Sequence, residues 1–417
     1  MAVEPLDYGQ NPMLTVIALL ALPGNIRPST LFLAFAAIPF IFYSIALYSS
    51  WHFFRRSRFL NIPRPDFTPP VSIVKPVRGV DPDAYENFAS NCRQDYPGDY
   101  ELVFCLGNDS DPVLPVIEKL ALEFPERTIR VIFGATATGA SDKAAKLAYL
   151  TAAAQHEILV IADSDVRVQP DYLRSIVAPL ADPAVGAVTC LYAAADRHSF
   201  IEHFHTIGMI SDLYAGILTA WQLDGIKFAL GATIVTTKTR LAEFGGYAAL
   251  ENRLADDLLV GRLIAERGYE VRLLPYAPVK LAGYESFGQL LDKRLRWITV
   301  MRHMRPWGHL GLIFTQGLAW CLLAIAVRPT APVIFGFLGT YLAFRVAITW
   351  LIGVWGMKQS GIAKRLPLLP LWDAFACAIW LASFLRNSVQ WRDQLYHIRA
   401  GGLLVPVAPS PAAPSKD

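Results

Sequence analysis

Six aspartates, grouped in three short segments, are the residues of this chain best suited to chemistry. They are Asp109 and Asp111 in GNDSDP, Asp163 and Asp165 in IADSDV, and Asp256 and Asp257 in LADDLLVG. Hard divalent cations prefer oxygen ligands, and Mg²⁺ is usually held by one or two carboxylates together with substrate phosphates. The three segments therefore predict a site for a divalent metal and a phosphorylated ligand.

Each segment also has a purely structural interpretation. An Asp-x-Asp triplet occurs by chance in many chains, and an aspartate between a strand and a helix often caps the helix. Asp256 and Asp257 would likewise favour a helix N-terminus through the helix dipole. For Asp163 and Asp165 the position favours a metal site, because the triplet directly follows an apolar run.

The elements that must position these aspartates are short apolar runs separated by amphipathic stretches. Such β-branched, nearly continuous runs are typical of buried parallel strands. The runs are 71–77, 101–107, 129–133 and 157–163, and the stretches include 81–92 and 112–124. This alternation predicts an α/β fold with a doubly wound, mostly parallel sheet. Ligands of such sheets bind beyond the carboxyl ends of the strands, where these aspartates lie.

The composition is that of a membrane protein. Of 417 residues, 53% are hydrophobic and only 18% charged, against about 25% charged in soluble domains. The formal charge of +3 offers no broad basic surface, so we expect no nucleic-acid partner. Five cysteines without CxxC spacing indicate neither a zinc site nor a disulfide framework.

Residues 29–54 are predicted to form a transmembrane helix. Residues 31–51 carry no charge, and about 20 residues suffice to cross a bilayer. Three arginines follow, so the positive-inside rule places residues 1–28 outside the cytosol, as an extracytoplasmic or interfacial segment. A proline-rich linker then leads into a cytosolic domain at 61–305.

Residues 308–386 are predicted to contain two or three further membrane segments. If the third crossed the membrane, three following arginines would lie outside, so an interfacial or re-entrant hairpin is the alternative. Arg345 interrupts one apolar run and should face a partner or a cavity. Residues 400–417 are expected to be disordered from their composition.

The ordered motifs of this chain resemble those of the ceramide glucosyltransferase family. The segments, found between about residues 30 and 310, are VKPVRGVDPDAYEN, QDYP, GNDSDP, IADSDVRVQPDYL, LADDLLVGRLIAERG and KRLRW. APLADPAVGAVTCLY, FALGATI and FGGY are most similar to the bacterial branch, which includes glycosyltransferases of hopanoid biosynthesis. The resemblance implies a cytosolic GT-A domain flanked by transmembrane helices, in a bacterial inner-membrane protein.

The resemblance also implies which aspartates act. The family's first aspartate position falls on Asp109, although a gapless comparison places Asn108 there, and neighbouring Asp111 joins it near the nucleotide. The second falls on Asp163, which with Asp165 would bind Mg²⁺ or Mn²⁺ and the donor diphosphate. The third falls on Asp257, the expected base for the acceptor hydroxyl. A carboxylate in that role gives a single displacement with inversion at the anomeric carbon.

The family's last motif, Q/R-x-x-R-W, falls on KRLRW, with Lys293 in place of Gln or Arg. Sugar transfer leaves negative charge on the departing diphosphate, and cationic side chains stabilise that charge. Arg296 is therefore expected at the diphosphate and Trp297 at a sugar or the acceptor. An interfacial anchor is the alternative for both, because basic and aromatic residues favour that depth.

Further polar groups and glycines have weaker assignments. A loose cluster of Glu202, His203, His205 and Asp212 allows metal ligation, but a helix surface near the acceptor entrance is the favoured interpretation. Lys143 and Lys146 are placed either at the diphosphate or on a solvated helix face. The last group is glycines that allow either close approach to the acceptor or simple turns: Gly231, Gly245 and Gly246.

The function expected from these observations is transfer of glucose, another hexose or an N-acetylhexosamine from a UDP-sugar to a membrane-lipid hydroxyl. Ceramide and a hopanoid-type lipid are the two acceptors considered. A processive polysaccharide synthase or a dolichol-phosphate sugar transferase is the alternative enzyme. A non-catalytic nucleotide-binding membrane scaffold is the alternative from another class, and loss of UDP binding would favour it.

Overall fold

The computed structural model describes most of the chain. The described residues are 27–59, 67–134, 139–194, 199–281, 283–284, 286–391 and 394–407. The expected N-terminal segment 1–28 lies almost entirely outside them. Residues 61–66 of the proline-rich linker also lie outside them.

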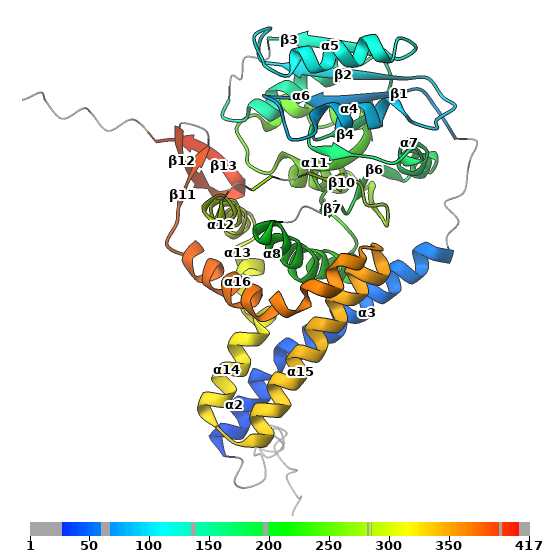
Figure 1. Cartoon of the computed structure of the whole chain (residues 1–417). Coiled ribbons are helices and arrows are strands. Elements are labelled where there is room, and N and C mark those ends of the chain that lie inside the picture. Colours follow the sequence, from blue (N-terminus) through cyan, green and yellow to red (C-terminus); the bar gives the residue numbers. More distant parts are fainter. Residues whose placement is uncertain are drawn as a thin grey trace, which may run out of the picture.

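A seven-stranded sheet forms the centre of one half of the molecule (Figure 1). Its order is β3-β2-β1-β4-β8-β6-β9. The strands pair in parallel except β8, which runs antiparallel to β4 and β6. Their bounds are β1 Val71–Pro76, β2 Tyr100–Leu106, β3 Thr128–Phe133, β4 Ile158–Ala162, β6 Val185–Cys190, β8 Thr233–Thr237 and β9 Glu270–Leu274. The four strands expected from the apolar runs are confirmed.

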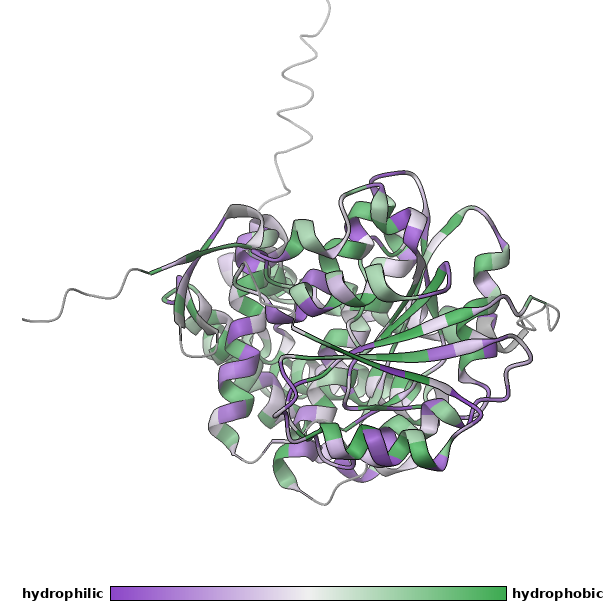
Figure 2. Cartoon of the chain, turned by 90° about the horizontal axis from the view of Figure 1, so that it is seen from above, coloured by the Kyte–Doolittle hydropathy of each residue, from purple (hydrophilic) through white to green (hydrophobic). Residues whose placement is uncertain are grey.

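Helices cover both faces of this sheet, as the continuous apolar character of the strands requires. Neighbouring residues of β1 point to opposite cores: Ile73 packs with Phe88 and Ile117, and Val74 packs with Leu147. The central strands are accordingly mostly hydrophobic, whereas the helices around them mix both colours in Figure 2. The covering helices include α4 Ala84–Cys92, α5 Leu114–Glu123, α6 Asp142–Ala153, α7 Tyr172–Val177 and α11 Asp256–Ala265.

A second, three-stranded sheet brings distant segments to the acidic strand end. Its order is β5-β10-β7, with β5 Val166–Arg167, β7 Ala193–Ala194 and β10 Val279–Lys280. Lys280 pairs in register with Val166, one residue beyond the DSD triplet. This pairing places a lysine more than 100 residues away beside Asp163 and Asp165.

Among the described residues, three helices are long and apolar enough to cross a membrane, or four if a helix pair bent by 56° forms one span. They are Pro28–Arg56, Ala331–Gly356 and Ser360–Ser383, and the bent pair is Pro306–Thr315 with Gly317–Val327. In Figure 1 the helices α2 (Pro28–Ala36), α14 (Gly317–Val327) and α15 (Ala331–Thr349) gather at the end remote from the sheet. These helices agree with the expected membrane segments.

Between the remote helices and the sheet lies a layer of helices that contact one another. Helix α16 (Leu369–Ser383) runs across this layer and packs on α12 (Phe287–Met304) and α8 (Phe200–Gly208) (Figure 1). Helix α8 continues into the π-helix η2 (Met209–Tyr214) and then α9 (Ala215–Asp224). This arrangement places the apolar helices, called the membrane-side helices below, directly against the half of the molecule that contains the sheet.

Arg345 of α15 is buried and faces partners, as expected. Its guanidinium donates to Asp373 of α16 (Nε to Oδ2, 2.8 Å) and to Asp212 of η2 (Nη2 to Oδ1, 3.0 Å). It also donates to the carbonyl of Ser211. One buried cation thus ties two membrane-side helices to the π-helix.

The expectation of a disordered tail from residue 400 is wrong for residues 400–407. Three antiparallel strands, β11 (Ser388–Trp391), β12 (Gln394–Arg399) and β13 (Leu403–Pro406), form a small sheet. Leu404 is buried against Leu254 and Val300, which gives the end of the chain a core of its own. Backbone bonds join Leu254 N–H to Gly402 and Leu404 N–H to Asn252. Residues 408–417 lie outside the described residues.

Candidate active site

Asp163 lies directly after β4 and is neutralised by two lysines. Lys143 Nζ donates to Oδ1 (2.7 Å) and Lys280 Nζ to Oδ2 (2.6 Å). Burial opposes ionisation, but the two ammonium groups outweigh it and hold the pKa of Asp163 well below its ordinary range. The strand end therefore carries an ionised carboxylate at any physiological pH.

Asp165 shares Lys280 with Asp163. Its Oδ1 is buried, lies 3.1 Å from Lys280 Nζ and has no hydrogen-bond partner among the described residues. Asp81, which follows β1, joins this group because Ser164 donates to its Oδ2. Burial raises the pKa of Asp81, and the neighbouring charge of Asp165 adds to the effect. Three carboxylates thus meet at adjacent strand ends.

Asp257 stands in the first turn of α11. Its Oδ1 accepts the N–H of Leu258 at 2.8 Å. Burial and the adjacent Asp256 raise the pKa of Asp257 to about 6, against the charge of Lys143. A carboxyl with a pKa near the working pH is suited to general-base chemistry.

Lys143 connects the two acidic groups. Burial disfavours its charge, but Asp163, Asp256 and Asp257 together raise the pKa of Lys143. The structure thus brings Asp163 and Asp257 into the electrostatic range of one lysine. Lys146 lies elsewhere: it donates to the carbonyl of Val77 (2.7 Å) and holds the loop after β1.

The loop after β2 contains the first expected aspartate position. Asp109 is exposed on this loop. Asp111 instead accepts the N–H groups of Gly79 (3.0 Å) and Val113 (3.1 Å), so it joins the loops that follow β1 and β2. Both residues lie at the expected edge of the sheet, and Asp111 has a structural role there.

The KRLRW segment lies on α12. Lys293 is within cation–π range of Trp297, with 5.4 Å between its Nζ and the ring centroid. Burial and the cations Lys280, Arg296 and Arg294 lower the pKa of Lys293 to about 8, although Asp165 opposes them. The charges that act on Arg296 are instead Tyr284, Arg386 and Asp292. Lys293 lines the same pocket as Lys280, which contacts the acidic strand end.

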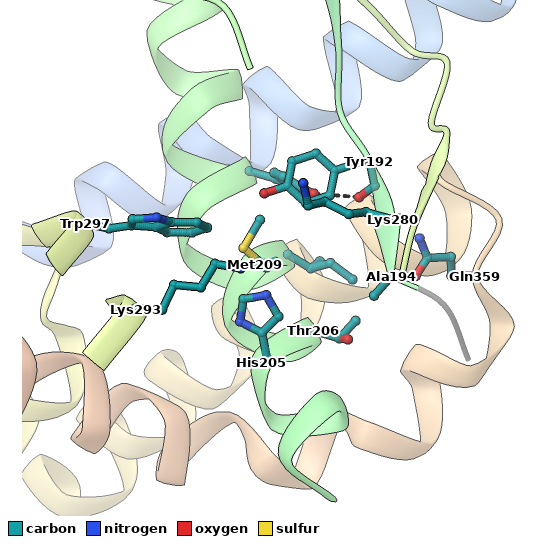
Figure 3. Close-up of a pocket in the computed structure, with 11 residues that line it drawn as sticks. Tyr192, Ala194, His205, Thr206, Met209, Lys280, Lys293, Trp297 and Gln359 are labelled. Carbon is teal, nitrogen blue, oxygen red and sulfur yellow. Dashed lines mark hydrogen bonds between the residues drawn. The ribbon is translucent and has the colours of Figure 1, made fainter. Parts of the chain in front are cut away.

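A pocket lies beside this acidic group, because Lys280, which contacts Asp163 and Asp165, is one of its lining residues (Figure 3). Its cavity is small, about 20 Å³ of space for the centre of a water-sized molecule, and it is partly open to solvent. Lys280 and Lys293 are its cationic lining residues. Trp297 forms one wall, as Figure 3 shows. The remaining lining is mostly apolar or aromatic: Tyr192, Ala194, His205, Thr206, Met209, Ile210, Tyr214 and Gln359.

The polar cluster expected near an acceptor entrance is divided by the structure. His205 lines the pocket, whereas Asp212 binds Arg345 and the indole N–H of Trp372. Gly231 approaches Asp257 rather than open space. Gly245 and Gly246 have φ values of 86° and 62°, so a turn accounts for both.

Comparison with known proteins decides the family. The profile of glycosyl transferase family 21 matches residues 31–404. The chain belongs to this family. Among relatives, ceramide glucosyltransferase 3 of Caenorhabditis elegans is 24% identical over 350 residues, covering 81% of this chain and 74% of that protein. Beta-monoglucosyldiacylglycerol synthase of Synechocystis is 27% identical over 235 residues, covering 55% of this chain and 47% of that protein.

A solved structure supports the fold of this family 21 glycosyltransferase. The mannosyltransferase PcManGT from Pyrobaculum calidifontis, in complex with GDP-Man and Mn²⁺, superposes with a TM-score of 0.50. It is 20% identical and covers 84% of this chain and 98% of its own. The expected GT-A fold and the resemblance to ceramide glucosyltransferases are therefore confirmed.

The site of this family 21 glycosyltransferase fits a metal that is shared with a ligand. Within the described ranges, no group of three or more His, Cys, Asp or Glu side chains could hold an ion by itself. The unbonded Oδ1 of Asp165 is a suitable single ligand, and diphosphate oxygens would complete an octahedron. The donor set is hard oxygen, which suits Mg²⁺ or Mn²⁺.

Three residues of this glycosyltransferase site had no assignment from the sequence. Asp81 follows β1 and obeys the same strand-end rule that singled out Asp163. Lys75, within β1, is buried and donates to the backbone carbonyl of Asp163 (3.2 Å). Lys280 reaches the site only through the β5–β10 pairing, for which the sequence gives no local signal.

Proposed function

We propose that this family 21 enzyme transfers a sugar from a UDP-sugar to a hydroxyl group of a membrane lipid, with inversion. The relatives named above are a ceramide glucosyltransferase and a glucosyldiacylglycerol synthase, and both names denote lipid acceptors. The observation that carries the proposal is a mostly apolar pocket between the acidic strand end and the membrane-side helices. A lipid headgroup and a water-soluble donor would meet there.

The donor diphosphate is assigned to the strand ends. Asp165 and Asp163, with Lys280 and Lys143 beside them, form a mixed-charge surface suited to a metal–diphosphate pair. A bound Mg²⁺ or Mn²⁺ would offset the charge that develops on the leaving diphosphate. Lys280 and Lys293, both near Asp165, would supply further positive charge.

The remaining donor contacts follow from the motif positions. Asp109 and Asp111 lie at the carboxyl end of β2 and are assigned to the nucleoside side of the donor. Arg296 is assigned to the diphosphate and Trp297 to a sugar or the acceptor. The assignment of Trp297 is supported by its position, because Trp297 lines the pocket.

Asp257 is assigned as the base. The acceptor oxygen forms a bond to the anomeric carbon as the bond from that carbon to the diphosphate oxygen breaks. Asp257 takes the hydroxyl proton, and UDP leaves with the bonding electron pair. A single displacement of this kind inverts the anomeric configuration and needs no covalent enzyme intermediate.

The membrane arrangement is part of the proposal. We assign residues 29–54 and segments within 308–386 to the membrane and residues 61–305 to the catalytic domain, on the cytosolic side of a bacterial inner membrane. Arg55 and Arg56 at the domain end of α3 (Ile38–Phe59) support this orientation through the positive-inside rule.

Asp257→Asn tests the assignment. The variant protein, purified in detergent, is expected to bind UDP normally but to lose transfer by a factor of about 10³ or more, because it lacks the base. The control is Asp224→Asn, an exposed aspartate paired with Lys227, which should retain activity. Full transfer by Asp257→Asn would remove the base assignment, and absence of UDP binding by the unaltered protein would favour the scaffold alternative.

A further inference from the structure

Two polar side chains of the pocket have hydrogen-bonding atoms that nothing in the described structure satisfies. They are Nδ1 of His205 and Nε2 of Gln359, and both atoms are buried. In Figure 3 the two residues come from different elements and flank Met209. Buried polar groups are hydrogen-bonded in the great majority of cases, so two exceptions in one pocket point to a ligand.

His205 is held in a neutral, oriented state. The residue is only 6% exposed, and its Nε2 lies 3.3 Å from the hydroxyl of Tyr284. Burial, together with the positive charges of Arg294 and Lys293, lowers the pKa of His205 well below its ordinary value. A neutral imidazole has one donor and one acceptor nitrogen. Because Tyr284 engages one nitrogen, the other is available to the pocket.

Gln359 supplies a donor on the other side. Its Nε2 can only donate, so its missing partner is an oxygen acceptor. Around these two atoms the lining is apolar at Met209, Ile210 and Ala194. A purely hydrocarbon occupant would leave both polar atoms unsatisfied, and a fully hydrated occupant would lose the apolar contacts.

We infer that this pocket recognises a second polar group of the acceptor, separate from the hydroxyl that reacts. The ligand class is an amphiphile with at least two polar groups, the second being a hydroxyl or amide oxygen that bonds to His205 Nδ1 and Gln359 Nε2. This inference rests on the proposed function, because it takes the acceptor to be a lipid. It makes His205 and Gln359 determinants of acceptor specificity.

A matched pair of acceptors tests it: 1-hexadecanol and 1,2-hexadecanediol in detergent micelles, with a UDP-sugar as donor. The unaltered enzyme should favour the diol by about tenfold or more in kcat/KM, the factor that one good hydrogen bond supplies. Gln359→Met, nearly equal in size, and His205→Phe, which keeps a ring against Tyr284, should each reduce that ratio to below about threefold. The KM for the donor should stay unchanged.

Thr206→Val is the matched control. Thr206 lines the same pocket, but its hydroxyl already donates to the carbonyl of Glu202 at 2.7 Å. Loss of this hydroxyl should leave the diol preference within twofold of the preference of the unaltered enzyme.

Four results would overturn the inference. Equal use of both acceptors by the unaltered enzyme, or an undiminished diol preference in both variants, removes it while the proposed function stands. A raised donor KM with unchanged acceptor preference assigns the pocket to the donor sugar instead. Transfer to no lipid acceptor at all removes the proposed function as well.

Discussion

The backbone of Gly231 lies directly against the carboxylate of Asp257. A methyl group at position 231 would lie 2.9 Å from Oδ2 of Asp257, closer than carbon and oxygen normally approach. Gly231 precedes β8, which pairs with β4, so a rigid part of the sheet supports the proposed base. The absent side chain thus determines where the carboxylate can lie.

Gly231→Ala is therefore expected to reduce kcat by about tenfold or more, because a small displacement of a base is costly for proton transfer. UDP affinity should change little. Gly216→Ala is the matched control, since a methyl group there would meet no atom within 4 Å. Steady-state kinetics and UDP titration of both variants check this, and an unchanged kcat in Gly231→Ala would contradict the placement of Asp257 at the reacting hydroxyl.

Activity should decrease at acid pH through Asp257. The pKa of Asp257 is raised to about 6, and only the ionised carboxylate can accept a proton. Below pH 6, kcat should therefore decrease about tenfold per pH unit, and above pH 7 this group should no longer limit the rate. A pH profile of kcat measures it.

Two variants identify the group behind that acid limb. His205→Phe should retain the limb, since the pKa of His205 already lies well below its ordinary value. The residual activity of Asp257→Asn should lack it. A limb that persists in Asp257→Asn would assign the titration to another residue.

Lys280 is expected to compete with a metal for the acidic strand end. It contacts Asp163 (2.6 Å) and Asp165 (3.1 Å), so Lys280→Gln leaves two carboxylates with one lysine fewer. Without UDP, Mn²⁺ should bind this variant several-fold more tightly, because two ionised carboxylates attract a dication more strongly once their cation is gone. Calorimetric titration of Mn²⁺ measures the change.

With the donor present, the same variant should bind the UDP-sugar more weakly, by up to about tenfold, since a charge-assisted contact to the diphosphate is lost. Lys227→Gln serves as the control, because Lys227 is exposed and pairs with the surface residue Asp224 at 2.7 Å. Unchanged Mn²⁺ affinity in Lys280→Gln would argue against Asp165 as a metal ligand.

Removal of Arg345 should destabilise the whole chain. Arg345→Met leaves Asp373 without its buried counterion and Asp212 without an ion-pair partner at 3.0 Å. Breaking a buried pair by removing one partner typically costs about 3–5 kcal/mol. Thermal unfolding in detergent should show a clear decrease in the midpoint for Arg345→Met. The double variant Arg345→Met with Asp373→Leu should show a smaller decrease in the midpoint than the single variant. Equal stability of Arg345→Met and the unaltered chain would contradict the ion pair.

Local sequence patterns predicted four of the seven strands, β1 to β4, and one half of the site. The apolar runs before Asp163 and Gly107 end where β4 and β2 end, because strand burial and strand-end placement are local consequences of hydrophobicity. Asp81 also follows a strand, β1. The sequence alone does not single it out, because one aspartate lacks the repeated pattern of DSD.

The other half of the site depends on contacts between distant segments. Lys280 reaches Asp163 only because β10 pairs with β5, and His205 reaches the pocket only because α8 packs against α12 and α16. Neither contact can be predicted from a local periodic pattern of the sequence. The strand at Leu403–Pro406 was missed for the same reason: its core partners, Leu254 and Val300, lie far away in sequence.

The bonds between the last strand and the loop before Asp257 have a topological consequence. Leu404 pairs with Asn252 and Gly402 with Leu254, so the end of the chain must lie in the same compartment as the catalytic domain. A chain that leaves that compartment after α12 has to return, which requires an even number of crossings. Two of the three later candidate segments can therefore span the bilayer, but not all three. We propose that α16, which packs along α12 and α8, is the segment that stays at the membrane surface. The arginines after it would then lie on the side that carries Arg55 and Arg56.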